Sequence, residues 1–345
     1  MTPDRFEAIT SRYASLRIAV LGDFCLDRYL EIDPAREETS LETNLPVHNV
    51  INVRPQPGGA GTILNNLSAL GIGTIYPVGF AGQDGEGFEL CRALEAQPGV
   101  QMDYFLRTSQ RRTFTYCKPL LVRSGAPPVE LNRLDFKDWT PAPALLQGLL
   151  SKRLGEVAML VDAVIVLDQS HLPESGVVTR RVLAALQSLV EANPKLLVLA
   201  DSRRGLRDFP AVVFKMNAAE LAALKGTPTE LPPDAVEEAA RSLASHNGRN
   251  VFVTLAAGGI FGASPDGQAE RLPALPLRGK IDIVGAGDAV SANLTAAMAA
   301  GANLSETLEL ANSAASVVIH KLGTTGTANV GELWGLLEQL ADGCS

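Results

Sequence analysis

Short apolar runs alternate with amphipathic stretches along most of the chain. From position 142 onward the apolar runs are four to six residues long and end at polar residues, as AVIVL at 163–167 ends at Asp168. The stretch at 176–192 carries its apolar residues at helical spacing. Buried strands that alternate with helices predict a mostly parallel sheet covered on both faces, which is the α/β class.

This pattern predicts where the elements of the sheet and its helical layers lie. The predicted strands are 17–25, 74–80, 163–167, 196–200, 212–216 and 251–255. The predicted helices are 62–70, 85–96, 143–156, 176–192, 218–225, 234–246, 289–300, 305–321 and 330–341. The pair Gly258-Gly259 is predicted to turn a hairpin into the apolar residues that follow it.

Two segments depart from the alternation of strand and helix. Residues 28–54 are rich in Glu, Pro and Asn and contain short β-like pieces. Residues 103–135 contain further β-like pieces, with alternation visible at Phe114, Tyr116 and Lys118. Because a period of two is typical of strands, the two segments are predicted to form a small sheet outside the main layer.

Polar residues recur where the predicted strands end. In open α/β sheets, ligands bind at the carboxyl ends of the strands, so these residues favour an enzyme. The alternative is that each is a helix N-cap, which is common for any single case. They are Asp23, Asp168, Asp201, Asn217 and Thr254.

The run from Gly279 to Asp288 carries the most specific chemical signal. Gly285, Ala286 and Gly287 allow a tight turn, and a helix that begins there would offer unpaired amides and a positive dipole end to an anion. A carboxylate beside an anion is explained if Asp288 accepts a proton from the group that attacks it. The run therefore indicates phosphoryl transfer, against the alternative of an Asp near the start of a buried Ala-rich helix.

Composition narrows the class of protein further. The formal net charge is −8 with a pI of about 5.2, and no Lys/Arg-rich run argues for nucleic acid. The four cysteines and four histidines form neither CxxC nor HExxH, and neither a dinucleotide fingerprint nor a P-loop is found. With no signal-like N-terminus and no apolar run long enough to span a bilayer, we expect a soluble, cytoplasmic protein with reduced thiols and no membrane partner.

Three short motifs in order resemble the PfkB/ribokinase-like sugar kinases over nearly the whole chain. They are Gly58-Gly59-Ala60 before a helix, Asn217-Ala218-Ala219-Glu220 after a strand, and DIVGAGD at 282–288. The resemblance implies a ribokinase-like three-layer α/β/α fold with a small β-sheet lid. It also implies one kinase domain over residues 1–345, with lid segments at about 28–54 and 103–135, and a homodimer formed through the lids.

Within the family, the chain most resembles the kinase module of ADP-heptose synthesis. That module phosphorylates D-glycero-D-manno-heptose 7-phosphate at O1. The stretches that carry this likeness are GDFCLDRYL, RPQPGGAG, NRLDF, ADSR and HKLGTTG. The resemblance implies ATP, Mg²⁺ and a sugar or sugar phosphate as ligands.

The resemblance also implies roles for residues on the phosphoryl side. Asp288 would be the catalytic base, and the amides of Gly285, Ala286 and Gly287 would hold the transferring phosphoryl group. Glu220 would organise Mg²⁺ through water, and Asp282 would help to bind a monovalent cation such as K⁺. The residues implied to bind ATP are Asn217, Glu220, Thr254, Ala256, Gly259 and Asn312.

The implied sugar contacts are Asp27, Gly58, Gly59 and Asp168, since a carboxylate can accept hydrogen bonds from adjacent hydroxyls. The basic residues that could balance a phosphate on the sugar are Arg111, Arg112, Lys118, Arg203 and Arg204.

Several positions depart from the family pattern. Thr62 replaces Asn, Ile283 replaces Thr, Ala256 replaces Gly, and residues 168–171 (DQSH) replace Asp-Tyr-x-Lys-Gly. Two alternatives therefore stay open beside a heptose phosphate kinase. One is another PfkB activity on fructose, ribose, a nucleoside or a sugar acid, and the other is a silent sugar- or nucleotide-binding protein of the same fold.

Overall fold

The computed structural model describes residues 1–227 and 231–342, so Cys344 lies outside the described residues. A mostly parallel sheet forms the centre of the molecule, in the strand order β17-β16-β15-β14-β13-β12-β1-β6. Within the described residues, β15–β16 and β16–β17 are antiparallel pairs, and the other neighbouring strands of this sheet are parallel. Its strands are β1 (Arg17–Gly22), β6 (Thr74–Val78), β12 (Ala163–Asp168), β13 (Leu197–Ser202), β14 (Val213–Asn217), β15 (Val251–Thr254), β16 (Ile260–Ala263) and β17 (Ala269–Leu272).

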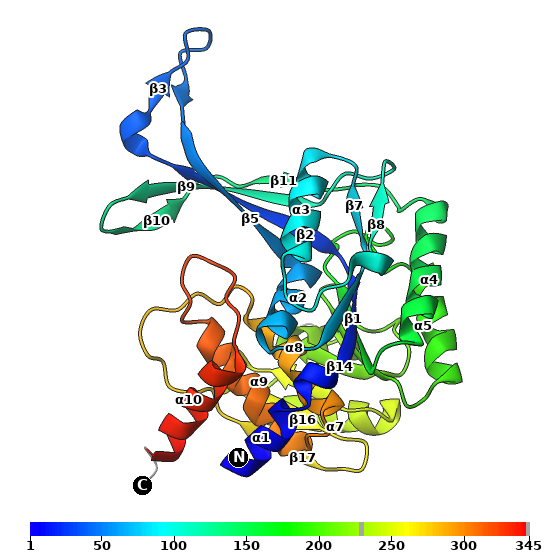
Figure 1. Ribbon diagram of the computed structural model, residues 1–345. Coiled ribbons are helices and arrows are strands. Elements are labelled where there is room, and N and C mark those ends of the chain that lie inside the picture. Colours follow the sequence, from blue (N-terminus) through cyan, green and yellow to red (C-terminus); the bar gives the residue numbers. More distant parts are fainter. Residues whose placement is uncertain (228–230, 343–345) are drawn as a thin grey trace.

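Helices cover both faces of the central sheet (Figure 1). One layer contains α1 (Pro3–Thr10), α2 (Ala60–Ala69), α3 (Gly85–Glu95), α8 (Ala286–Ala299), α9 (Leu304–Val318) and α10 (Val330–Asp342). The other contains α4 (Ala144–Ala158), α5 (Arg180–Ala192), α6 (Ala218–Lys225) and α7 (Pro233–Asn247). The predicted α/β class and the two helical layers are therefore confirmed.

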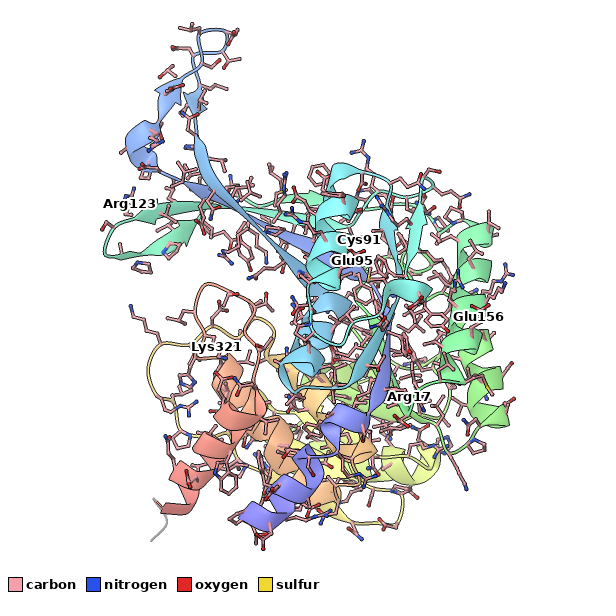
Figure 2. All side chains as sticks on the ribbon, in the orientation of Figure 1. Arg17, Cys91, Glu95, Arg123, Glu156 and Lys321 are labelled. Atoms are coloured by element: carbon pink, nitrogen blue, oxygen red, sulfur yellow. The ribbon has the colours of Figure 1, made fainter. Side chains whose placement is uncertain are left out.

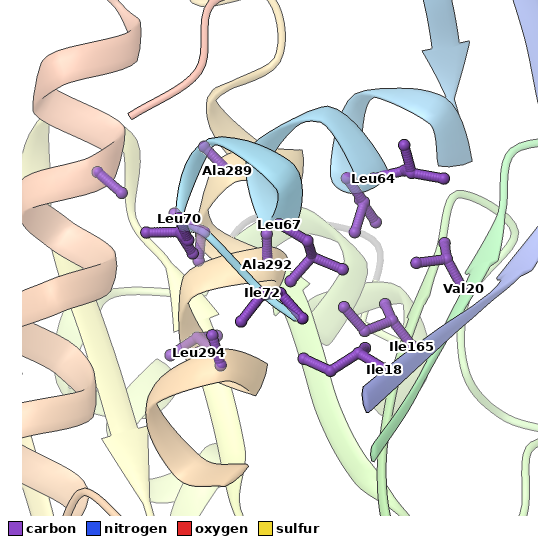
Figure 3. Close-up of a cluster of buried hydrophobic side chains, with 14 of the residues drawn as sticks. Ile18, Val20, Leu64, Leu67, Leu70, Ile72, Ile165, Ala289, Ala292 and Leu294 are labelled. Atoms are coloured by element: carbon purple, nitrogen blue, oxygen red, sulfur yellow. The ribbon is translucent and has the colours of Figure 1, made fainter. Parts of the chain in front are cut away.

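The strand β1 shows how the sequence divides the core between the two layers. Ile18 and Val20 pack in one hydrophobic cluster, whereas Ala19 and Leu21 pack in the other. Successive side chains of a strand point to opposite faces, so a continuously apolar strand contributes side chains to the hydrophobic clusters on both faces of the sheet. Figure 3 shows Ile18 and Val20 beside Leu64 of α2 in the first cluster.

A second sheet projects from the body as an arm (Figure 1). Its order is β10-β9-β2-β5, and β11 also pairs with β9. The strands are β2 (Phe24–Ile32), β5 (Val50–Gly59), β9 (Thr115–Arg123), β10 (Ala126–Glu130) and β11 (Leu134–Phe136). The short strands β3 (Glu38–Thr39) and β4 (Pro46–Val47) pair near the end of the arm.

Two predicted strands are wrong in their bounds. The strand predicted at 17–25 ends at Gly22, and Asp27 lies inside the new strand β2 instead of after a strand. The strand predicted at 74–80 ends at Val78 because the Gly79 carbonyl accepts from the N–H of Leu106 at 2.9 Å. Residues beyond it form β7 (Phe80–Gly82), which pairs with β8 (Leu106–Thr108) outside the projecting sheet.

One predicted helix also begins later than its apolar pattern suggests. The pattern predicts a start at 176, whereas α5 begins at Arg180 after the N-cap Thr179. The Asp23 carboxylate accepts from the N–H of Val177 at 2.6 Å, which holds the preceding residues in a loop. Separately, no helix in the described residues is long and apolar enough to cross a membrane.

Candidate active site

The glycine turn before α8 lies at the centre of the candidate site. Gly285 is the N-cap of α8 with φ +82°, a left-handed conformation that favours glycine, and a methyl group there would come within 2.6 Å of Thr325 Cγ2. The helix begins at Ala286, three residues earlier than predicted. The Ala286 N–H donates to the Ile283 carbonyl at 3.2 Å. The amide of Ala286 is thus already engaged, and the amides that an anion would need come from the rest of the first turn, beginning at Gly287.

Asp288 lies in this first turn of α8. Burial raises its pKa to about 7, and the nearby carboxylates of Asp201 and Asp27 act in the same direction. Lys215 and Arg203 oppose that shift. A carboxylate with a pKa near neutrality is matched to accept a proton at physiological pH.

A buried ion pair that sequence reasoning missed lies against the same turn. Lys215 Nζ is 2.7 Å from Asp201 Oδ2, and Ser291 Oγ donates to that same oxygen at 3.0 Å. A methyl group on Gly287 would come within 3.2 Å of Lys215 Nζ. Asp201 was singled out as a strand-end residue, but Lys215 was not. Its signal is a lysine within the otherwise apolar strand VVFKM.

The first of two proposed sugar-binding carboxylates, Asp27, lies in the strand β2 of the projecting sheet. Its Oδ1 is 3.1 Å from Lys118 Nζ on β9, and burial still raises its pKa although Lys118 opposes the shift. A methyl group on Gly58 would come within 2.9 Å of Asp27 Oδ2. Gly59 follows as the N-cap of α2. The pairing of β2 with β5 thus brings these three predicted residues together.

Asp168 ends β12 and faces a different set of partners. Its Oδ2 accepts from Ser202 Oγ at 2.8 Å and lies 2.8 Å from Arg204 Nη2. The other oxygen, Oδ1, is buried and has no protein partner among the described residues. Burial and the neighbouring carboxylate of Asp23 raise the pKa of Asp168 to about 6. The unpaired oxygen is positioned as an acceptor for a ligand hydroxyl.

Asp23, also at a strand end, has a structural role. Its Oδ2 accepts from the N–H groups of Gln169 and Ser170 at 2.9 and 3.0 Å. Together with its bond to Val177, these contacts occupy the carboxylate and fasten the loop 169–177. The role of Asp23 in holding this loop therefore explains why an aspartate follows the strand.

Asn217 and Glu220 form a capping box at the start of α6. Asn217 Oδ1 accepts from the Glu220 N–H at 2.8 Å, and Glu220 Oε2 accepts from the Asn217 N–H at 2.7 Å. Burial raises the pKa of Glu220. Thr254 is the partner of Asn217 in the β14–β15 register, so these three predicted nucleotide residues are neighbours.

The other predicted nucleotide residues lie around the segment 272–274. Gly259 packs against it, since a methyl group there would collide with the Leu272 carbonyl at 1.9 Å. Asn312 Nδ2 donates to the Pro273 carbonyl at 2.8 Å. Ala256 has φ +49°, a left-handed conformation in which glycine is favoured over alanine.

Asp282 lies just before the glycine turn and is hydrogen-bonded to the segment that follows α9. Asp282 Oδ1 accepts from the Val284 N–H at 3.0 Å, and the Asp282 N–H donates to the Ile319 carbonyl at 2.7 Å. Gln56 of β5 bonds to Thr324 of the same segment at 3.1 Å. Figure 2 shows Lys321 on this segment, below the projecting sheet.

A cavity opens beside Asp23 and the loop that it fastens. Four aromatic side chains line it, and two of its charged side chains are ion-paired, Lys137 with Asp135 and Asp138 with Arg111. Ser170 and His171, two of the positions that depart from the family pattern, also line it. The aromatic residues are Phe24, Phe80, Phe114 and Trp139.

Comparison with known proteins identifies the class. The sequence profile described as "pfkB family carbohydrate kinase" matches residues 17–329. The chain therefore belongs to the pfkB family of carbohydrate kinases, which are phosphotransferases with an alcohol group as acceptor. The family resemblance drawn from the three sequence motifs is confirmed.

Individual relatives are similar to this chain at moderate identity. "Bifunctional protein HldE" of Azorhizobium caulinodans is 30% identical over 325 residues, which cover 94% of this chain and 65% of that protein. The protein of the same name from Halorhodospira halophila is 33% identical over 316 residues, which cover 90% of this chain and 61% of that protein. The chain thus spans less than two thirds of the length of these relatives.

Solved structures confirm the ribokinase-like fold. Phosphofructokinase-2 from Escherichia coli in complex with potassium has a TM-score of 0.71 at 18% identity, covering 94% of this chain and 99% of that one. Ribokinase from Arabidopsis thaliana, complexed with ribose and ATP, has a TM-score of 0.65 at 20% identity, with the same coverages.

Proposed function

We propose that this protein is an ATP-dependent kinase that phosphorylates a sugar or sugar-phosphate hydroxyl, with a heptose 7-phosphate-like acceptor preferred. The observation that carries the proposal is Asp288, a carboxylate with a pKa of about 7 in the glycine-capped first turn of α8. This arrangement combines a base with an anion site, which phosphoryl transfer to an alcohol requires.

In the proposed reaction, the acceptor oxygen attacks the γ-phosphorus of ATP. A new O–P bond forms, the bond to the bridging β–γ oxygen breaks, and its electron pair leaves with ADP. The hydroxyl proton passes to the Asp288 carboxylate. The N-terminal amides of α8, including that of Gly287, stabilise negative charge on the transferring group.

The residues present fit a magnesium ion that is shared with ATP. The described residues contain no cluster of three or more acidic, His or Cys side chains that could enclose a metal. Mg²⁺ keeps several waters and needs only one or two carboxylates beside the phosphates, where it would neutralise phosphate charge. Glu220 would hold it through water, because Mg²⁺ gives up its water ligands reluctantly.

Asp282 fits a monovalent cation such as K⁺ in the same proposal. Its Oδ1 accepts from Val284, which leaves Oδ2 for a ligand. The hydroxyl of Thr325 is buried and has no hydrogen-bond partner within the described part of the chain, and Thr325 packs on the glycine turn. Oxygen donors of this kind suit a hard cation.

Basic side chains around the proposed sugar site support a phosphorylated acceptor. Lys118 contacts Asp27, and the Arg133 guanidinium lies 4.2 Å from the centre of the Tyr116 ring. Arg204 contacts Asp168. A heptose 7-phosphate would present hydroxyls to the carboxylates and its phosphate to these cations. The relatives named HldE support this choice.

A second candidate is a kinase whose acceptor carries a neutral planar ring, as in a nucleoside. The aromatic cavity beside Asp23 favours it, because four aromatic side chains suit such a ring better than a phosphate. Phe114 of this cavity also contacts Tyr116, with ring centres 4.8 Å apart, which links the cavity to the proposed sugar site.

We further propose that the projecting sheet is a lid within one kinase domain, and that two lids pair in a homodimer. The sheet carries exposed apolar side chains at Val50, Ile51, Val53 and Val129. Exposed apolar patches and open sheet edges mark interaction surfaces. Closure over the sugar would exclude water and limit ATP hydrolysis.

A coupled ADP-release screen with Mg-ATP tests the function. The acceptors are heptose 7-phosphate, fructose, ribose, adenosine and a sugar acid. Turnover with heptose 7-phosphate alone would support the preferred assignment, and turnover with adenosine alone would select the second candidate. Nucleotide binding without ADP release for any acceptor would favour a silent binding protein.

A further inference from the structure

The lysine in the middle of the central sheet has an unusual position. Lys215 is only 6% exposed, and its ammonium group lies between the Asp201 carboxylate and the first turn of α8. The N-terminus of a helix carries partial positive charge, so a cation is unfavourable there. Burying an ion pair also costs free energy that well-packed apolar side chains would not. Packing alone therefore does not explain a lysine at this position.

The surroundings of Lys215 are arranged to hold a cation close to an anion-binding turn. Asp201, 7% exposed, receives both the ammonium of Lys215 and the hydroxyl of Ser291 on one oxygen. Burial lowers the pKa of Lys215, but the carboxylates of Asp201, Asp288 and Glu220 together outweigh burial, so the pKa lies above its usual value and the lysine stays charged. An anion at the first turn of α8 would face both the helix amides and this ammonium.

We propose that Lys215 is a catalytic residue whose ammonium contacts the transferring phosphoryl group at the first turn of α8, and that Asp201 and Ser291 are its positioning residues. The inference rests on the proposed phosphoryl transfer. Lys215 gains and loses no proton in the step. Its charge stabilises the negative charge that spreads over the phosphoryl oxygens as the bond to ADP breaks.

Nucleotide binding tests the contact without any acceptor. By calorimetry, Lys215→Met should weaken binding of a non-hydrolysable ATP analogue roughly tenfold or more, since a hydrogen bond to a charged group is lost. Binding of ADP, which lacks the γ-phosphoryl group, should stay within about twofold. The matched control is Lys152→Met, because the Lys152 side chain is 69% exposed on α4, where it pairs with Glu156. Equal effects of Lys215→Met on both nucleotides, or none, would overturn the proposal.

A double variant separates catalysis from folding. Lys215→Met leaves the Asp201 carboxylate buried without its partner, which destabilises the fold. Asp201→Asn with Lys215→Met removes both charges and should restore the melting temperature. Turnover should stay roughly 10²–10³-fold below the wild type, as for loss of one donor to the transition state. Recovery of wild-type turnover in the double variant would make Lys215 a structural residue only.

The pH profile gives a signed readout of the charges that face Asp288. Asp288 is faced by Asp201 on β13, Lys215 on β14, Arg203 after β13 and Asp27 on β2. Lys215 favours ionised Asp288 and Asp201 opposes it. The acidic limb of kcat/KM should therefore move to higher pH in Lys215→Met and to lower pH in Asp201→Asn. Shifts in the same direction would contradict the inference.

The outcomes also separate this inference from the proposed function. Suppose that no acceptor releases ADP, but Lys215→Met selectively weakens binding of the ATP analogue. The inferred phosphoryl contact would then hold and the kinase assignment would fail. If the wild-type enzyme is active but Lys215→Met does not selectively weaken binding of the ATP analogue, the kinase assignment would hold and the inferred contact would fail.

Discussion

Asp288 and Asp168 are both carboxylates with raised pKa values, yet their surroundings are assembled in opposite ways. Asp288 belongs to one continuous run, 282–288, in which the glycine turn, the helix start and the base follow one another. Asp168 depends on Ser202 at the end of the next strand, on Arg204 just after it, and on Asp23 at the end of β1. The anion turn and its base are thus local in sequence, whereas the partners of Asp168 come from distant segments.

This difference explains why the sequence predicts the phosphoryl-transfer chemistry more readily than the identity of the acceptor. A turn that binds an anion needs backbone amides and a helix end, which a short motif encodes. A sugar pocket needs side chains from several strands at matched positions, so substitutions at 168–171 can change its ligand while leaving 282–288 intact. The following predictions test whether the two halves of the site, the phosphoryl half around Asp288 and the acceptor half around Asp168, are separable.

The largest expected effect is on the phosphoryl half. Asp288→Asn should lower kcat roughly 10²–10⁴-fold, the usual contribution of general base catalysis. ATP should still bind, because the amides of the turn are unchanged. Steady-state kinetics and nucleotide calorimetry check the two statements, with Asp4→Asn on the exposed α1 as a matched control. Near-normal turnover of Asp288→Asn would show that the base has been misassigned.

The acceptor half should respond in KM instead. Asp168→Asn removes the charge that faces Arg204 and alters the free Oδ1, so the KM for the acceptor should rise roughly 10- to 100-fold. The KM for ATP should stay unchanged. Initial-rate measurements with each substrate varied in turn provide the check. Parallel increases in both KM values would mean that the two halves are not separable.

The dependence of activity on pH should follow Asp288. The base acts only when ionised, and its pKa of about 7 places the loss of kcat/KM below neutral pH. Each further pH unit should lower kcat/KM roughly tenfold, with an added decline once Asp168, with a pKa of about 6, becomes protonated. A profile at constant ionic strength tests this. A profile that is flat from neutral pH to about pH 5 would exclude Asp288 as the titrating base.

The smallest expected effect concerns the nucleotide loop, a third and local region. Ala256→Gly should raise the free energy of unfolding by up to about 1 kcal/mol, because glycine adopts φ +49° without the strain that alanine carries. Urea denaturation measures the change. Ala239→Gly, in the middle of the helix α7, should shift stability in the opposite direction. A loss of stability in Ala256→Gly would argue that the strain is absent.

Local pattern was sufficient for most of the fold. The apolar runs predicted the parallel strands. The polar residues at the carboxyl ends of these strands could be predicted because each apolar run ends at a polar residue. The misplaced bounds have tertiary causes. Asp23 keeps residues 176–179 out of α5 through a bond to Val177, and Leu106 draws the chain away from β6 after Val78.

The α/β class, the family and the anion turn with Asp288 could be predicted from the sequence alone, because each depends on residues close together in the chain. Only the tertiary structure brought Lys215 to Asp201 and Gly287, and Asp27 to Lys118 and Gly58. Those contacts join segments that lie far apart in sequence, through strand register and helix packing. A lysine in an apolar strand becomes a candidate catalytic group only when the fold shows what its ammonium faces.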